Sequence, residues 1–131
     1  MKIDSGVNLK LRVVPERLAV CRLEPDAELP PWAMTGRFRS VSWTPAELSI
    51  VCQESSVPEG VTSERGWRCL MVVGPLDFSL TGILLRIAEP LAKAGISIFA
   101  ISTFDTDYVL VKDASFAEAQ RILEQSGHTF S

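Results

Sequence analysis

The order of the strand and helix patterns in the second half of the chain most strongly limits which fold it can adopt. WRCLMVV at 67–73 is an apolar strand pattern, as is ISIFAIST at 96–103, and YVLVK at 108–112 follows as a hairpin partner. One helical pattern lies between the first two strands, and another follows the third. The order β-α-β-β-α over 67–127 predicts a ferredoxin-like α+β fold with both helices on one face of the sheet.

Both helices are predicted from apolar residues at helical spacing and from residues suited to their ends. Ser79 is the predicted N-cap of the first helix, and Gly95 is predicted to end it. Ser115 and Glu118 are spaced as a capping box for the second helix, which is predicted to end at Gly127. The apolar stripe of the first helix consists of Leu80, Ile83, Leu84, Ile87 and Leu91.

The first half of the chain is strand-rich. Alternating patterns predict strands at 9–14 and 17–23, separated by a turn at Pro15-Glu16. Two more strands are predicted at 38–43 and 47–53, around a turn at Thr44-Pro45, and one helical turn is expected near Pro31–Met34. This half is interpreted as a degenerate copy of the second half or as an extension of the same sheet. The predicted domains are 1–66 and 67–131.

Composition excludes several classes of function. The 131 residues carry a net charge of -3 without any cluster of basic residues, which argues against nucleic-acid and membrane partners. No signal peptide or membrane span is expected, and the three scattered cysteines indicate reduced, half-buried thiols in a cytoplasmic protein. The single histidine, His128, cannot supply a zinc site, and it is expected to be solvated or to cap a helix. We expect no metal, no cofactor and no catalytic residue.

The acidic turn FDTD at 104–107 interrupts two apolar strands. Asp and Thr are common turn residues, so an Asx-turn alone is one explanation. The other is a binding role, in which Asp105 or Asp107 accepts hydrogen bonds from an ammonium or a guanidinium group. Phe104 is then an apolar wall of the site, although it is equally compatible with a place in the core. The residues alone leave these alternatives open.

The segment GPLDFSLTGILLRIAEPLAKAGISIFAISTFDTDYVLV at 74–111 resembles the ACT domain family. The resemblance covers about 67–130 well, and TPAELSIVC at 44–52 is also similar to the first half of short tandem-ACT proteins, such as the animal arginine sensors. It implies a tandem of ACT-like halves, the first of them degenerate.

The resemblance also implies a site. In the family, small molecules, usually amino acids, bind at interfaces between two ACT units, between the loop before the first helix and the second strand with its turn. Carried onto this chain, the implied ligand-binding residues are Asp77, Phe78, Ser79, Leu80, Thr81, Gly82, Thr103, Phe104, Asp105 and Asp107. An aspartate matching Asp107 meets the cationic side chain of the ligand in the arginine sensors, but the neighbouring residues Asp105 and Thr106 occupy variable places.

The predicted function is that of a non-catalytic, amino-acid-binding regulatory module. The resemblance implies a homodimer and a regulated protein partner supplied in trans. Two alternatives stay open: a ligand-independent interaction module, and a small enzyme that uses the carboxylates of Asp105 and Asp107.

Overall fold

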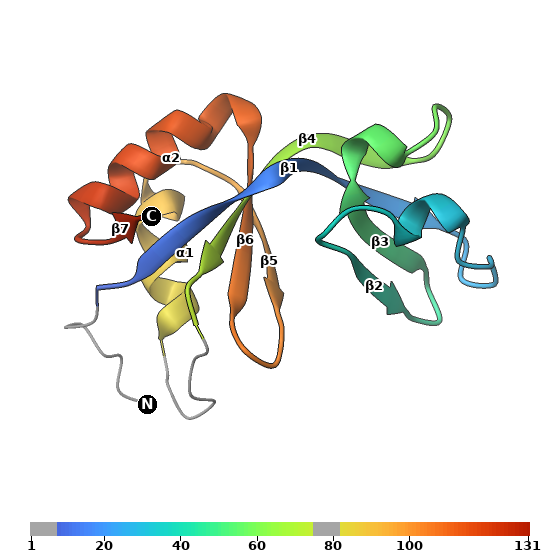
Figure 1. Cartoon of the computed structure of the whole chain (residues 1–131), viewed down its shortest axis with the longest axis horizontal. Coiled ribbons are helices and arrows are strands. Elements are labelled where there is room, and N and C mark those ends of the chain that lie inside the picture. Colours follow the sequence, from blue (N-terminus) through green and yellow to red (C-terminus); the bar gives the residue numbers. More distant parts are fainter. Residues whose placement is uncertain (1–7, 75–81) are drawn as a thin grey trace. The chain divides into compact units, whose positions relative to one another are not determined.

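The computed structural model describes residues 8–74 and 82–131, in two compact units. Unit 1 takes in the described residues of Met1–Val14 and Arg68–Ser131, and unit 2 is Pro15–Trp67. The long strands β1 (Lys10–Leu23) and β4 (Ser63–Val72) contribute residues to both units (Figure 1).

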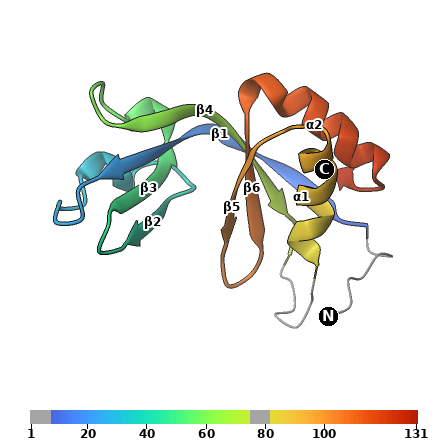
Figure 2. The same cartoon turned by 180° about the vertical axis from the view of Figure 1, so that it is seen from behind.

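Unit 1 has the predicted α+β order. Its sheet runs β7-β1-β4-β6-β5, and the helices are inserted in the order β4-α1-β5-β6-α2-β7. The remaining elements of this unit are α1 (Ile83–Lys93), β5 (Ile98–Ser102), β6 (Asp107–Lys112), α2 (Asp113–Gln125) and β7 (Thr129–Phe130). The ferredoxin-like prediction is therefore confirmed for this half, and Figure 2 shows the same elements from behind.

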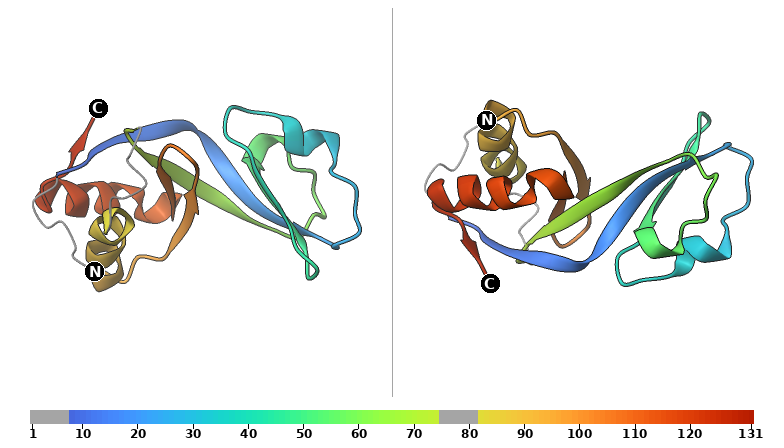
Figure 3. Two further views of the ribbon diagram at one scale, coloured as in Figure 1. Left: turned by 90° about the horizontal axis from the view of Figure 1, so that it is seen from below. Right: turned by 90° about the horizontal axis from the view of Figure 1, so that it is seen from above.

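The core of unit 1 lies between one face of the sheet and the two helices. Alternate strand residues point into it, because side chains in a strand point to opposite faces in turn. The strands contribute Leu9, Leu11, Leu70, Val72, Val109 and Val111, and the helices contribute Ile83, Ile87, Leu91, Ala119 and Leu123. Both helices therefore cover one face of the sheet, as predicted, and they lie next to each other in Figure 3.

Unit 2 is built from strands and short 3₁₀ turns. Its sheet runs β2-β3-β1-β4, with β2 at Ser40–Trp43 and β3 at Leu48–Gln53, and the 3₁₀ turns are η1 (Pro31–Met34) and η2 (Glu54–Ser56). Its separate core holds Ala19, Cys21, Ala33, Leu48, Ile50, Cys52 and Val57. The strand-rich prediction is confirmed. Whether this half is a degenerate ACT domain, with a boundary at 66/67, stays a prediction.

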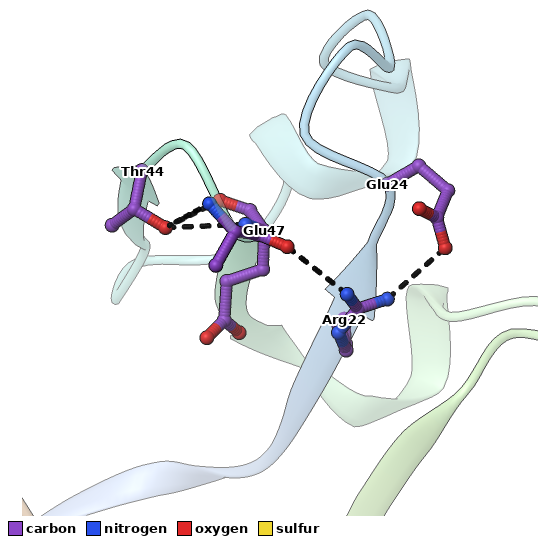
Figure 4. A network of polar contacts seen from close by, with 5 residues as sticks. Arg22, Glu24, Thr44 and Glu47 are labelled. Carbon is purple, nitrogen blue, oxygen red and sulfur yellow. Dashed lines mark hydrogen bonds and ion pairs between the residues drawn. The ribbon is translucent and has the colours of Figure 1, made fainter.

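The predicted turn at Thr44-Pro45 joins β2 to β3 and is held by side chains (Figure 4). The hydroxyl of Thr44 accepts hydrogen bonds from the backbone N–H groups of Ala46 and Glu47, at 3.2 and 3.1 Å. The guanidinium of Arg22, on β1, donates to the Ala46 carbonyl at 3.0 Å and forms an ion pair with Glu24 at 3.1 Å. The hairpin is thus fastened to β1 by contacts of a kind that strand patterns do not reveal.

The predicted turn at Pro15-Glu16 is wrong, because β1 runs through it as one strand. Backbone N–H groups alternate between the two edges of a strand. Lys10 and Arg22 bond toward β4, whereas Leu9 and Leu11 bond toward β7, so odd-numbered residues face away from β4. On that side, β7 pairs only as far as Leu11 and β3 pairs only from Leu18. In the described residues, no strand pairs with β1 on this side at Pro15. The missing N–H of the proline therefore costs no hydrogen bond between strands.

Three predicted starts need correction. Helix α1 begins at Ile83 with Gly82 as its N-cap, not at Ser79, which lies with Leu80 outside the described residues. Helix α2 begins at Asp113, so Ser115 stands inside its first turn and forms no capping box. Strand β4 begins at Ser63 rather than at 67. The predicted ends are confirmed: Gly95 and Gly127 follow the helices with φ of 75° and 101°.

Candidate functional site

The acidic turn is a tight hairpin closed by two threonines. The backbone N–H of Thr103 donates to the carbonyl of Thr106 at 2.8 Å, and the Thr103 hydroxyl donates to the same oxygen at 3.1 Å. Phe104 and Asp105 are left at the tip between β5 and β6. The turn interpretation is thus correct for the backbone, although the side-chain hydrogen bonds that close the turn come from the Thr103 hydroxyl rather than from an aspartate of an Asx-turn.

The tip presents an aromatic ring and a carboxylate to solvent. Phe104 has an exposed fraction of 79%, so the alternative that placed it in the core is wrong. Asp105 is also exposed. An exposed aromatic ring next to a carboxylate suits contact with a ligand or a partner better than it suits stability, because the burial of large apolar side chains is favourable.

Asp107 is the first residue of β6 and is half-buried. Its Oδ1 accepts a hydrogen bond from the Ser102 hydroxyl at 2.6 Å, and the two residues are cross-strand partners in the β5–β6 hairpin. This bond fixes the direction of the carboxylate and leaves its second oxygen for another donor. Ser102 was missed by sequence reasoning. Its place opposite Asp107 follows once the hairpin register is known.

Thr106 connects the turn to the rest of unit 1 through a hydrogen bond. The sequence did not predict this role. Its side chain has an exposed fraction of 7%, and its hydroxyl donates to the carbonyl of Val72 at 2.5 Å. Val72 is the last residue of β4. The β5–β6 turn, the end of β4 and the start of α1 lie at the same end of unit 1 in Figures 1 and 2.

Of the predicted residues before α1, the structure describes only Gly82. It is the N-cap residue of α1, and its φ of 78° lies in the left-handed region that favours glycine. Its carbonyl accepts the first bond of the helix, from Arg86 at 3.1 Å, and the first turn contains no acidic residue. The first turn of a helix carries N–H groups without partners inside the helix, and such groups favour an anion. Asp77, Phe78, Ser79, Leu80 and Thr81 lie outside the described residues.

His128 and the cysteines differ from expectation because they are buried. The prediction of a solvated or capping imidazole is wrong: His128 has an exposed fraction of 3%, and both ring nitrogens have backbone partners. All three cysteines are free and fully rather than half-buried. Burial raises the pKa of Cys69 to about 12, so this thiol stays neutral.

Cys21 and Cys52 lie on the neighbouring strands β1 and β3. The interaction of their thiols lowers the pKa of Cys21 and, together with burial, raises the pKa of Cys52. Both residues belong to the core of unit 2, which indicates a structural role. In the described residues, no cluster of three metal-ligating side chains occurs, and no helix there has the length and hydropathy of a membrane span.

Comparison with known proteins places these features in a family. The ACT domain model matches residues 62–125, and a model for an N-terminal domain matches residues 16–60. A crystal structure of an Agrobacterium tumefaciens protein is 36% identical, with a TM-score of 0.91, and the match covers 96% of this chain and 94% of that one.

Two further relatives have informative names. The human protein named cytosolic arginine sensor for mTORC1 subunit 1 is 40% identical over 68 residues, which are 50% of this chain but only 21% of that protein. A structure of aspartokinase alpha and beta subunits shares the fold, with a TM-score of 0.63 at 16% identity over 92% of this chain and 98% of that one. The family match, the α+β order and the near full-length relative agree, and the chain belongs to the ACT domain family.

Proposed function

We propose that this protein is a non-catalytic regulatory module that binds an amino acid. The ligand lies between the residues before α1, at 77–82, and the strand and turn at 103–107. The observation that carries the proposal is the hydrogen bond from Thr106 to Val72. It holds the acidic turn at the end of β4, the strand that precedes α1 in the chain, and this supports a site that uses both sides.

The chemistry of the two sides suits a zwitterion. The N-terminal turn of α1 offers N–H groups and the positive end of the helix dipole to a carboxylate. Asp107, oriented by Ser102, and the exposed Asp105 offer acceptors to an ammonium or guanidinium group. Phe104 provides an apolar surface beside them. Two exposed or half-buried carboxylates favour a ligand with a cationic group.

The comparisons support the class of function. A relative named as an arginine sensor and the fold shared with aspartokinase subunits both favour amino-acid sensing over catalysis. His128 already bonds through both ring nitrogens, so it is poorly placed to act as a general base near the turn. We further propose that the protein works in the cytoplasm as a homodimer and acts on a protein partner in trans. Such action requires a partner whose affinity differs between the free and bound forms.

Thermal unfolding in the presence of each of the twenty amino acids, at about 1 mM, tests this proposal. A ligand at about 100 times its Kd adds about 2.7 kcal/mol of stability, which is a shift of several degrees for a chain of this size. We expect one or a few amino acids with a cationic side chain to raise the Tm. No response from any amino acid would contradict amino-acid binding.

Asp107→Asn tests the site itself. The amide keeps an acceptor for the Ser102 hydroxyl but removes the charge, so we expect the variant to fold normally and to lose the ligand-induced shift. Glu124→Gln is the matched control, since it removes one exposed negative charge on α2 and should respond like the wild type. An Asp107→Asn variant with the full shift would rule out this carboxylate as a ligand contact.

One observation favours a second function. Phe104 is 79% exposed at the tip of a hairpin, which is also typical of a residue that contacts a protein partner. In that case the module is ligand-independent. Its stability would then be unchanged by all twenty amino acids, and Phe104→Ser would weaken capture of the partner without lowering the Tm.

A further inference from the structure

The single histidine of the chain lies at a junction of three segments of unit 1. It follows α2 and Gly127, whose left-handed φ of 101° turns the chain back toward the helix. The backbone N–H of His128 donates to the carbonyl of Leu123 at 3.1 Å. The ring then projects between β1 and α1, and the residue is 3% exposed. A buried imidazole in such a place needs partners for its polar atoms.

The hydrogen bonds define the protonation state of the ring. The backbone N–H of Leu9 points at Nδ1 over 3.0 Å, and a backbone N–H can only donate. Nδ1 must therefore accept, which places the proton of the neutral ring on Nε2. From there it is donated to the carbonyl of Arg86, 3.3 Å away. In the neutral imidazole, both ring nitrogens therefore have hydrogen-bond partners. A second proton, on Nδ1, would place two N–H donors opposite each other and break the bond with Leu9.

The surroundings also oppose a charged ring. From α1, the side chains of Arg86, Glu89 and Lys93 line the same cavity of about 520 Å³ as His128, and the end of α2 adds Ser126. Lys93 and Glu89 form an ion pair at 3.4 Å, and the residue before β1, Leu9, presents its backbone N–H to the ring. Burial lowers the pKa of His128, the bond to the Arg86 carbonyl raises it, and the charge of Arg86 lowers it again; the net direction is downward.

The ring is followed by a very short strand. Strand β7 has two residues and pairs in parallel with Lys10 and Leu11. Its backbone N–H groups bond to the start of β1 and the residue before it, from Thr129 to the Leu9 carbonyl and from Ser131 to the Leu11 carbonyl, each at 2.9 Å. Phe130 packs against the core of unit 1, so the imidazole of His128 adds polar contacts to a short strand that is held by few other bonds.

We propose that His128 is a proton-sensitive clasp, which holds β7 against β1 and α1 when the imidazole is neutral and releases it when the ring is protonated. In the released state, the ring has the ordinary pKa of about 6.5. Because the closed state binds the second proton less readily, the clasp is fully formed above that pH and weakens as the pH falls below it. The released fraction should rise by up to about tenfold between pH 7.5 and pH 5.5. This range lies above the ordinary pKa values of Asp and Glu, so carboxylates contribute little.

Amide hydrogen exchange at single-residue resolution tests the clasp. After correction for the intrinsic pH dependence, exchange at Leu9, Thr129 and Ser131 should rise about tenfold from pH 7.5 to 5.5. The amides of Val109 and Leu110, two fully buried residues of β6, serve as internal controls and should not follow. His128→Asn keeps an acceptor near the Nδ1 position but cannot be protonated in this range, so its exchange should not depend on pH. The same rise in the Asn variant would overturn the proposal.

A second measurement does not depend on any variant. The ring nitrogens of the single histidine give one pair of ¹⁵N signals in NMR spectra, and the neutral form should show the proton on Nε2. The signals should titrate below 6.5, together with the exchange at β7. A ring that titrates at its ordinary pKa, or that titrates without any change at Thr129 and Ser131, would show that no clasp exists.

Discussion

At the scale of the residue, Thr106 shows how one hydroxyl can decide the position of a turn. The backbone of the turn is closed by Thr103, but only the side chain of Thr106 reaches β4. The acceptor is the carbonyl of Val72, the last residue of β4. If a buried carbonyl loses its hydrogen-bond donor, the free energy of unfolding falls by the cost of removing that carbonyl from water.

Thr106→Val removes this donor while it preserves the shape of the side chain. We expect the free energy of unfolding to fall by about 1–3 kcal/mol, because the Val72 carbonyl is left without the hydroxyl in a buried place. Urea denaturation measures the change. Thr106→Ser keeps the hydroxyl and should lose distinctly less. A Val variant as stable as the wild type would show that the hydrogen bond contributes nothing.

At the scale of the element, α1 buries one face and exposes the other. Ile83, Ile87 and Leu91 are spaced four residues apart and are buried, whereas Leu85 is 40% exposed on the same helix. The period of the apolar residues therefore identified the buried face correctly, even though the predicted N-cap was wrong. The packing of this face, rather than the capping of its ends, supplies most of the stability of the helix.

Substitution of one buried and one exposed leucine on α1 by alanine tests whether the buried face stabilises the helix. Leu91→Ala should lower the free energy of unfolding by about 2–5 kcal/mol, since it leaves a cavity in the core of unit 1. Leu85→Ala makes the same chemical change on the exposed face and should cost less than about 1 kcal/mol. Chemical denaturation followed by circular dichroism compares the two. Equal losses would mean that the apolar stripe does not define the buried face.

The elements that sequence predicted well are those set by local periodicity. Strands β5 and β6 follow from short apolar runs, and the buried face of α1 follows from helical spacing. The wrong predictions concern places where distant partners decide. Pro15 is accommodated because neither β7 nor β3 pairs beside it, and Ser115 loses its capping role because α2 starts two residues earlier. No local pattern contains this information.

The residues of the candidate site also differ in whether the sequence could predict them. Thr103 and Asp107 came from the resemblance to a family, and the structure places both on one hairpin. Ser102 and the bond of Thr106 to β4 were missed, because their partners lie across the hairpin and on β4. The burial of His128 was not predicted for the same reason. Its ring accepts a hydrogen bond from the backbone N–H of Leu9, which is 119 positions away. Polar partners far apart in sequence require the fold to be known.

At the scale of the whole molecule, the strands β1 and β4 each belong to both units. One core lies in each unit; β1 supplies residues to both cores, and β4 supplies Leu70 and Val72 to the core of unit 1. A strand that belongs to two units couples their stabilities, because it must be ordered for either core to form. Both units should therefore unfold in one cooperative transition.

Two optical probes can follow the units separately. The three tryptophans, Trp32, Trp43 and Trp67, all belong to unit 2, whereas α1 and α2 belong to unit 1. We expect the tryptophan fluorescence and the helical circular dichroism to give coincident urea transitions. Ile87→Ala, in the core of unit 1, should shift both curves together. Separate midpoints, or a shift in the circular dichroism alone, would show that the units unfold independently.

The nesting of unit 2 within unit 1 also sets an order for folding during synthesis. All of Pro15–Trp67 is translated before the helices of unit 1, so the inserted unit can pack first. Unit 1 needs residues 9–11 beside residues 128–131, and Leu9 and His128 are 119 positions apart. The start of β1 must therefore wait for both helices of unit 1 to be made, although the rest of the strand belongs to the inserted unit.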